Sequence, residues 1–366
     1  MTNGSPTLVS LFSGAGGLDY GLEKAGFSPR LFLEVCGKCC QTLARNFRGV
    51  PIINNDIREV SSDDVLRTSG LRRGEVTLVS GGPPCQPFST LAGAETRAKA
   101  LSDPRGNLFY QFARIVEDVR PRAFLLENVP GLLSAENGKV HETIVKVFSG
   151  IGYTLNSEVL NAADYGVPQV RKRMIIVGLK EGGKFKFPNP THAEAPKPRL
   201  DGPLKKWVTV GEAFQTITNE DRVRFGDLGL RHSKAMIEKM KMIPPGGNFR
   251  THLPREMWPR CWANGSHQGM DTFGRLVASK PSVTIRTSGY NPTKGRYIHP
   301  TEDRGLSTLE MSILQSFPKD YKFGGPLVEV GKQIGNAVPP VLAEQIGKAL
   351  LEQLGFKAVA IKATVP

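Results

Sequence analysis

Residues 7–18 read Thr-Leu-Val-Ser-Leu-Phe-Ser-Gly-Ala-Gly-Gly-Leu, and this stretch decides the class of fold. The apolar run at 7–12 predicts a buried strand, the glycines predict a tight turn, and residues 17–25 predict an amphipathic helix. Such a turn lets backbone approach a nucleotide-like ligand closely. The third glycine of a dinucleotide fingerprint would fall at position 19, which is Asp19. We therefore expect a nucleoside without phosphates as the ligand.

The same alternation of short apolar runs and longer amphipathic stretches continues to about residue 180. It predicts further strands at 30–35, 76–80, 123–127 and 174–179, and helices at 38–46, 107–119 and 140–151. This order predicts an α/β fold with a doubly wound, mostly parallel sheet, in which ligands bind at the carboxyl ends of the strands.

Two acidic residues follow the glycine turn at positions that suit a nucleoside. Glu34 lies 18 residues beyond Gly16, at the end of the next predicted strand, where an acid would accept hydrogen bonds from ribose hydroxyls. The carboxylate of Asp56 could accept a hydrogen bond from the exocyclic amine of an adenine. Either carboxylate alone could be a surface charge or a helix cap, but their order after a glycine turn favours a joint site.

The sequence changes character after residue 180. Residues 181–206 are rich in proline and lysine, and the chain up to about 300 has poor helical periodicity. Helices are predicted again at 308–316 and 340–353. We expect a catalytic and cofactor-binding domain at 1–184, a smaller, loop-rich domain at 185–300, and a C-terminal segment at 301–366 that returns to the first domain.

The composition is that of a globular protein. Of 366 residues, 39% are hydrophobic and 22% are charged. We find no run of about 18 apolar residues for a membrane span and no apolar leader, so we expect a cytoplasmic protein. Five cysteines argue against a disulfide framework, and their spacing predicts no metal site.

The formal net charge of +14 is unevenly distributed. Residues 181–280 carry 17 Lys and Arg against 10 Asp and Glu, which is half of the whole excess. A basic segment of this kind is the expected footprint of a polyanionic partner such as DNA. On charge alone, a merely soluble basic surface remains an equal alternative.

Residues 80–89 read Ser-Gly-Gly-Pro-Pro-Cys-Gln-Pro-Phe-Ser and place Cys85 between two prolines, just after a predicted strand. The glycines and prolines force a sharp turn, which would hold the sulfur at the mouth of a cleft. Cysteine becomes a nucleophile where nearby cations or a helix N-terminus favour the thiolate. An inert buried thiol is the alternative.

Taken together, these stretches and several later ones resemble, in order, the motifs of cytosine-5 DNA methyltransferases of the prokaryotic restriction-modification type. The later segments are Glu127-Asn128-Val129, Gln169-Val170-Arg171-Lys172-Arg173, Leu314-Gln315-Ser316-Phe317-Pro318 with Arg304 and Glu310, and the run at 331–340. Three positions depart from the family pattern. Ser10 stands where the family usually has an acid, Val35 replaces an aromatic residue of some members, and Cys36 stands where Asp is frequent.

The resemblance implies a specific chemistry. Cys85 would attack carbon 6 of a cytosine, because carbon 5 is too electron-poor to accept a methyl group directly. Glu127 would hold or protonate ring nitrogen 3, with a carboxyl pKa raised in a dry site. Asn128 would position the loop. Arg171 and Arg173 would hold the carbonyl oxygen of the base, orient Glu127 and favour the Cys85 thiolate.

The resemblance also implies a methyltransferase fold with S-adenosyl-L-methionine as cofactor and double-stranded DNA as substrate, and it needs no metal. The cytosine would be flipped out of the duplex, and residues 86–106 would close over it. Residues 185–300 would form the target-recognition domain. We expect a monomer associated with the nucleoid, and a restriction enzyme as its partner. A tRNA methyltransferase and an inactive DNA-binding homologue are the alternatives.

The residues expected to bind each ligand form two sets. For the cofactor they are Phe12, Gly14, Ala15, Gly16, Gly17, Leu18, Glu34, Val35, Asp56, Ile57, Pro83, Leu108, Asn336 and Val338; for DNA they are Gln86, Ser89, Asn264, Ser266, His267, Gln268 and Arg275.

Overall fold

The computed structural model describes residues 5–84, 107–133, 138–196, 202–264, 269 and 271–356. The chain forms two compact units. Unit 1 comprises Met1–Asn161, Lys172–Asn189 and Leu342–Pro366, and unit 2 comprises Ala162–Arg171 and Pro190–Val341. The units thus divide the chain differently from the three segments expected from sequence, since residues 162–171 and 301–341 belong to unit 2.

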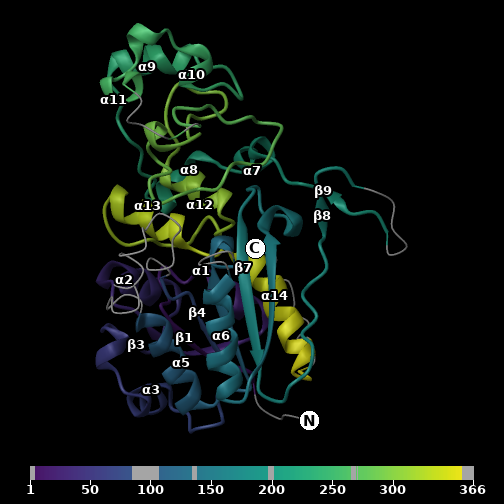
Figure 1. Cartoon of the computed structure of the whole chain (residues 1–366). Coiled ribbons are helices and arrows are strands. Elements are labelled where there is room, and N and C mark those ends of the chain that lie inside the picture. Colours follow the sequence, from purple (N-terminus) through teal and green to yellow (C-terminus); the bar gives the residue numbers. More distant parts are fainter. Residues whose placement is uncertain are drawn as a thin grey trace. The chain divides into compact units, whose positions relative to one another are not determined.

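Unit 1 is built on a seven-stranded sheet with the order β3-β2-β1-β4-β5-β7-β6 (Figure 1). β7 pairs antiparallel with both of its neighbours, and the other pairs are parallel. The predicted fold class, a doubly wound and mostly parallel α/β sheet, is confirmed. Its strands are β1 (Thr7–Leu11), β2 (Ser28–Leu33), β3 (Ile52–Ile53), β4 (Leu78–Gly81), β5 (Ala123–Asn128), β6 (Thr154–Asn161) and β7 (Lys172–Leu179).

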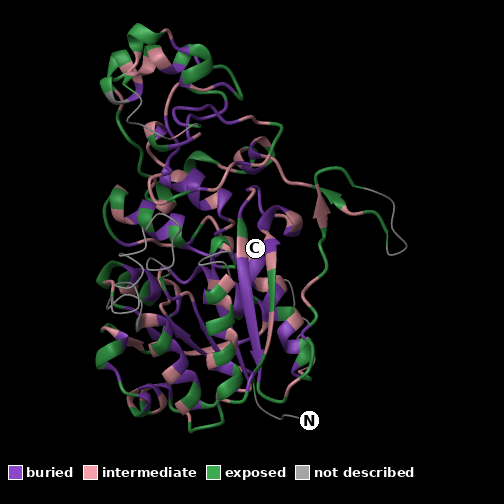
Figure 2. Cartoon of the chain, in the orientation of Figure 1, coloured by how far each residue is buried: buried purple, intermediate pink, exposed green. Residues whose placement is uncertain are grey.

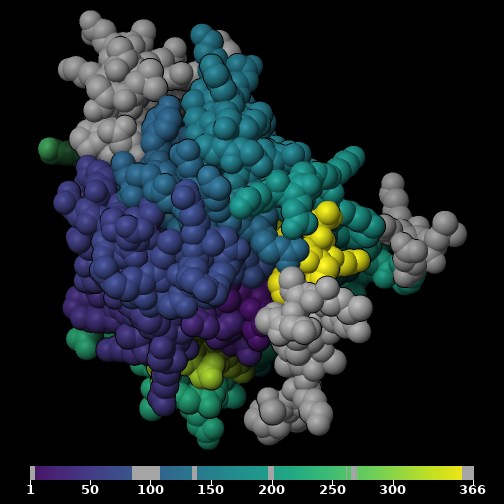
Figure 3. Space-filling view, turned by 90° about the horizontal axis from the view of Figure 1, so that it is seen from below, coloured from purple at the N-terminus to yellow at the C-terminus, as the bar shows by residue number. Residues whose placement is uncertain are grey.

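Helices cover both faces of this sheet because alternate strand residues point to opposite sides. Val9, Leu11 and Val79 share one apolar core with residues of α3, α5 and α6. α1 and α14 pack closely against each other, since a methyl group built on Gly347 would lie 2.6 Å from Ala25 Cβ. In Figure 3 the yellow residues of α14 lie beside purple N-terminal residues. The helices are α1 (Gly17–Ala25), α2 (Gly37–Asn46), α3 (Ser62–Ser69), α5 (Asn107–Val119), α6 (Lys139–Gly150) and α14 (Pro340–Gln353), with single turns η1 (Ile57–Glu59) and η3 (Pro130–Leu132).

Burial differs between the two last strands of the sheet. β7 is buried along most of its length, whereas β6, the outermost strand, is largely half-buried or exposed (Figure 2). The sequence does not predict β6, because its polar residues give no apolar run.

Unit 2 is made of short helices joined by long loops. Reciprocal side-chain caps at Thr209, Thr218 and Ser307 define where three of these helices begin. The helices between residues 210 and 263 have four to eight residues each, which is too short to produce a clear helical periodicity in the sequence. The elements are α7 (Val210–Gln215), α8 (Asn219–Phe225), α9 (Lys234–Lys241), α10 (Phe249–His252), α11 (Arg260–Ala263), α12 (Thr308–Leu314), α13 (Leu327–Asn336), β8 (His192–Ala193), β9 (Lys205–Lys206), η5 (Ala162–Tyr165), η6 (Arg255–Met257) and η7 (Pro292–Lys294).

Candidate active site

The glycine turn after β1 is tied to the end of β2 by one carboxylate. Glu34 Oε2 accepts a hydrogen bond from the Gly14 N–H at 2.7 Å, and Oε1 accepts one from the Cys36 N–H at 2.8 Å. The turn needs glycine, because Gly14 and Gly16 have φ angles of 55° and 77°. Burial raises the pKa of Glu34 above its ordinary value, and the two N–H groups oppose that rise. The carboxylate is therefore held in place at the carboxyl edge of the sheet.

The surroundings of Glu34 fit a nucleoside. A methyl group built on Gly14 would meet no atom within 4 Å, so the backbone there is open to a ligand. Val35 is 65% exposed, and its apolar side chain suits the face of a base. A fixed carboxylate, open backbone and an apolar surface are the groups that a ribose and its base require.

Other residues predicted for the cofactor differ in their settings. Phe12 has a φ of 55° and packs partly buried against the core, as does Leu108. Asp56 caps η1 and forms an ion pair with Arg58 at 2.6 Å, which lowers its pKa. Ile57 lies in the apolar core. In unit 1, Ala15, Gly16, Gly17, Leu18 and Pro83 are buried; in unit 2, Val338 is buried and Asn336 is exposed.

A second cluster lies where the neighbouring strands β4 and β5 end. Arg173 Nε lies 2.7 Å from Glu127 Oε1, and each side chain is 13% exposed. A methyl group built on Gly82 would lie 3.1 Å from Glu127 Oε2, so glycine allows the chain to pass close to this carboxylate. Asn128 Nδ2 donates to the Pro83 carbonyl at 3.2 Å. Glu127 and Asn128 thus contact the segment that leads into Cys85.

Arg171 has a setting that the sequence did not predict. Its side chain is 1% exposed, and its guanidinium donates to the carbonyls of Ile285, Gly335 and Ala337 at 2.8–3.0 Å. These three acceptors are backbone groups of unit 2. These hydrogen bonds hold two segments of unit 2 together, and the expected contact of Arg171 with the base stays a prediction.

The residues predicted to contact DNA divide into three groups. Asn264 is exposed at the end of α11. Arg275 is 5% exposed, and it donates to the carbonyls of Met240, Ile243, His299 and Glu302 and pairs with Asp303. Its guanidinium bonds to internal acceptors, and its predicted contact with DNA stays a prediction. Cys85, Gln86, Ser89, Ser266, His267 and Gln268 lie outside the described residues.

Sequence reasoning missed one acidic residue beside the glycine turn. Asp19 lies in the first turn of α1, is fully buried, and neither carboxylate oxygen has a hydrogen-bond partner. In the sequence, Asp19 stands out only as the residue that interrupts the dinucleotide fingerprint. The sequence does contain a signal for its burial. Asp19 lies between Leu18 and Leu22, which belong to the apolar face of the predicted helix.

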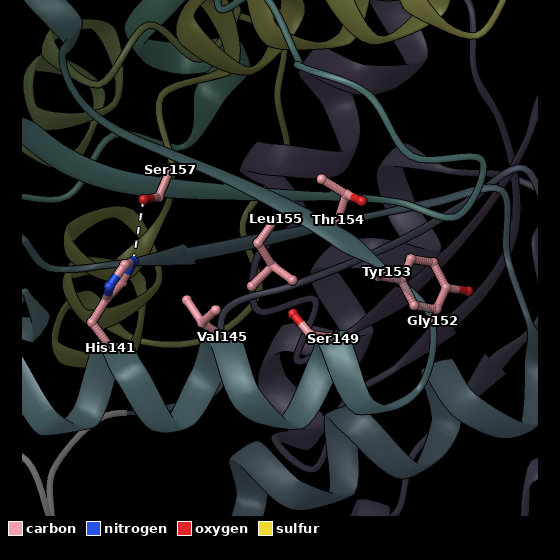
Figure 4. Close-up of a pocket in the computed structure, with 8 residues that line it drawn as sticks. All are labelled: His141, Val145, Ser149, Gly152, Tyr153, Thr154, Leu155 and Ser157. Atoms are coloured by element: carbon pink, nitrogen blue, oxygen red, sulfur yellow. Dashed lines mark hydrogen bonds between the residues drawn. The ribbon is translucent and has the colours of Figure 1, made fainter.

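A separate hollow of about 560 Å³ lies between α6 and β6 (Figure 4). At one end of it His141 Nε2 lies within hydrogen-bond distance of Ser157 Oγ, at 3.2 Å. None of its lining residues belongs to the predicted site. Within the described part of the chain no group of acidic, cysteine or histidine residues is arranged to hold a metal, and no helix is long and apolar enough to cross a membrane.

Comparisons with known proteins point to one family. The family profile described as C-5 cytosine-specific DNA methylase matches residues 7–352. The type II methyltransferase M1.HphI of Haemophilus parahaemolyticus is 36% identical over 95% of this chain and 87% of its own length. M.NgoFVII of Neisseria gonorrhoeae, also a type II methyltransferase, is 34% identical over 96% and 87%.

Solved structures share the fold. A protein described as a DNA modification methyltransferase encoded within an Escherichia coli prophage superimposes with a TM-score of 0.74, at 22% identity, over 96% of this chain and 100% of its own. A DNMT2 mutant of Spodoptera frugiperda gives a TM-score of 0.64 at 15% identity, over 95% and 100%.

Proposed function

The chain belongs to the C-5 cytosine-specific DNA methylases, and from that premise we propose that it methylates carbon 5 of a flipped-out cytosine in one duplex DNA sequence through a transient cysteine adduct. The observation that carries the proposal is the cluster at the ends of β4 and β5, where Glu127 and Asn128 contact Gly82 and Pro83 just before Cys85. That contact supports a nucleophile and an acid that act on one base.

In the proposed reaction, the Cys85 thiolate adds to carbon 6 of the cytosine and electron density moves onto carbon 5. Glu127 donates a proton or hydrogen bond to ring nitrogen 3 as charge develops there, and Arg173 fixes the carboxyl orientation through its 2.7 Å contact. After methyl transfer, carbon 5 gives its proton to solvent, the electrons of that C–H bond form the C5–C6 double bond, and the carbon–sulfur bond breaks to return the thiolate. Any proton that Glu127 gave to ring nitrogen 3 returns to its carboxylate.

S-adenosyl-L-methionine, when bound, supplies the electrophilic methyl group. Glu34 would accept hydrogen bonds from its ribose, the open backbone at Gly14 would lie against it, and Val35 would contact its adenine. The Asp56–Arg58 pair lets Asp56 remain an anion that can accept from an adenine amine.

The type II relatives support a role in protecting DNA from a restriction enzyme. We propose duplex DNA as the substrate, a cytoplasmic, nucleoid-associated monomer, and a cognate restriction enzyme in the same system. The basic segment at 181–280 would contact DNA phosphates, and exposed residues such as Asn264 would read base edges.

The test is transfer of tritium from labelled S-adenosyl-L-methionine to mixed-sequence DNA or to tRNA, followed by analysis of the modified base. We expect the label in 5-methylcytosine of DNA. Label in tRNA alone would show that the substrate is tRNA and not duplex DNA. Cys85→Ser should abolish turnover while DNA binding persists. Cys261→Ser is the matched control for a serine exchange elsewhere. Covalent trapping on fluorocytosine DNA should occur with the wild type and fail with Cys85→Ser.

A further inference from the structure

Asp19 is an acid buried in the middle of one face of the sheet. Ser10 on β1 and Ser80 on β4 are paired in register, and all three side chains are 0–1% exposed. Asp19 reaches this position from the first turn of α1, immediately after the glycine turn. These three polar side chains therefore form a small buried cluster between the sheet and α1, the helix that begins at the candidate cofactor site.

The carboxyl of Asp19 has no hydrogen-bond partner. Neither oxygen accepts a bond of ordinary geometry, and the Ser80 hydroxyl is likewise unpartnered. The Ser10 hydroxyl is used by Ser13 in the glycine turn, at 2.9 Å. A buried carboxylate with no well-formed hydrogen bond costs more than the neutral acid. Burial raises the pKa of Asp19 to about 7, although the hydroxyls of Ser10 and Ser80 and the N–H of Asp19 itself oppose the rise.

The charged side chain that acts on Asp19 disfavours its anion. The groups that face it from β1 and β4 are hydroxyls, and the charged residue that acts on it is Glu23, an acid one turn along α1. What α1 offers instead is the partial positive charge of its N-terminus, which favours an anion in the first turn. A further positive charge at the glycine turn would tip this balance toward ionisation.

We propose that Asp19 is a positioning residue that binds a proton when the glycine turn carries no cation and releases it to solvent when a cationic cofactor binds there. The inference rests on the proposed function, in which the methyl donor carries a positive sulfonium and its demethylated product is neutral at sulfur. Asp19 would then be an anion in the complex with the donor and a neutral acid with the product. Asp19 would thus carry its negative charge only while the positively charged donor is bound. This difference would favour binding of the donor over binding of the product.

The experiment counts protons. The full chain is titrated at pH 7 with S-adenosyl-L-methionine or S-adenosyl-L-homocysteine in two buffers of different ionisation enthalpy, and the calorimetric difference gives the protons released. The same titrations on Asp19→Asn remove contributions of the ligands themselves. With the donor, the wild type should release up to about half a proton more than Asp19→Asn, since about half of Asp19 is protonated at that pH. With the product, the two proteins should agree.

The control is Glu23→Gln, which removes the neighbouring charge and should retain a release specific to the donor. Equal proton counts for wild type and Asp19→Asn with the donor would overturn the inference, as would an equal difference with both ligands. If Asp19→Asn does not fold, infrared difference spectra of the wild type decide: the protonated-carboxyl band should be lost with donor and kept with product. Failure to bind either ligand would overturn the proposed cofactor, and the inference with it.

Discussion

Replacement of Arg171 by methionine tests whether this arginine supports architecture or chemistry. The guanidinium donates three hydrogen bonds to backbone carbonyls, those of Ile285, Gly335 and Ala337. The Arg171 side chain is 1% exposed. Methionine matches much of the length and apolar surface of the side chain but donates nothing. The three carbonyls would remain buried without these donors.

The expected cost follows from those contacts. A hydrogen bond from a charged donor contributes about 1.5–3 kcal/mol, and such contributions do not simply add. A buried carbonyl left without its donor costs about 1–3 kcal/mol. We therefore expect Arg171→Met to lower the free energy of unfolding of unit 2 by about 3–5 kcal/mol. Arg171→Lys should recover only part of the lost stability. A compact ammonium group cannot donate to three carbonyls as widely spaced as those that the planar guanidinium reaches.

The assay is urea unfolding of the full chain, read from tryptophan fluorescence, because Trp207, Trp258 and Trp262 all lie in unit 2. Arg173→Met is the matched control. It breaks the pair with Glu127 in unit 1, so methyl transfer should fall while the tryptophan transition stays in place. If Arg171→Met unfolds at the same urea concentration as the wild type but loses methyl transfer, the architectural role is refuted and contact with the base is favoured.

Three further changes have defined outcomes. Glu34→Gln should weaken binding of S-adenosyl-L-methionine by about 1–3 kcal/mol, measured calorimetrically, because the amide is a poorer acceptor for the Gly14 and Cys36 N–H groups and for a ribose; unchanged affinity would count against the ribose assignment. Gly178→Ala should destabilise unit 1 by about 2 kcal/mol or more, because the new methyl would overlap the Phe124 ring, whereas Gly150→Ala, which meets no atom within 4 Å, should be tolerated. The folded-state pKa of Asp19 is about 7 and its ordinary value is 3.8, so the wild type is favoured most at low pH and loses this contribution as pH rises through 7. Asp19→Asn should consequently gain about 2–3 kcal/mol over the wild type in urea unfolding between pH 5 and 8, and a pH-independent difference would contradict the burial argument.

The sequence predicts the sheet of unit 1 well where its strands are buried. α1, α5 and α14 begin and end at the predicted residues, and β1 and β5 differ by one residue at one end. β6 was missed because an outermost strand needs only one apolar face, and residues 154–161 are mostly polar. α13 was missed because Gly331 and Gly335 interrupt its helical pattern, although each fits a place where a side chain would collide with Tyr290 or with the Thr287 backbone.

Parts of the candidate site were predictable because they follow strand ends. Glu34 and Glu127 each stand at the carboxyl end of a parallel strand, where the fold brings functional groups together. The role of Asp56 stays a prediction, and its partner Arg58 comes from a local turn that the sequence does not reveal. The sequence does not reveal the internal acceptors of Arg275, because an arginine in a basic segment resembles a phosphate or base contact until the fold is known.

Three separate motifs of the resemblance meet inside unit 2 through contacts to backbone. Gln169 donates to the Leu314 carbonyl and accepts from the Ile285 N–H, while Gln315 donates to the carbonyls of Ile334 and Ala337. Arg171 reaches the same Ala337 carbonyl. A buried carbonyl needs a donor whatever reaction the protein performs. A glutamine or arginine in these motifs is therefore explained by architecture, whereas Arg173, two residues on in β7, meets a carboxylate and can serve chemistry. The spacing of residues in the sequence cannot distinguish an architectural from a chemical role. Backbone carbonyls are present throughout the chain, and only the folded structure shows which side chains donate to them.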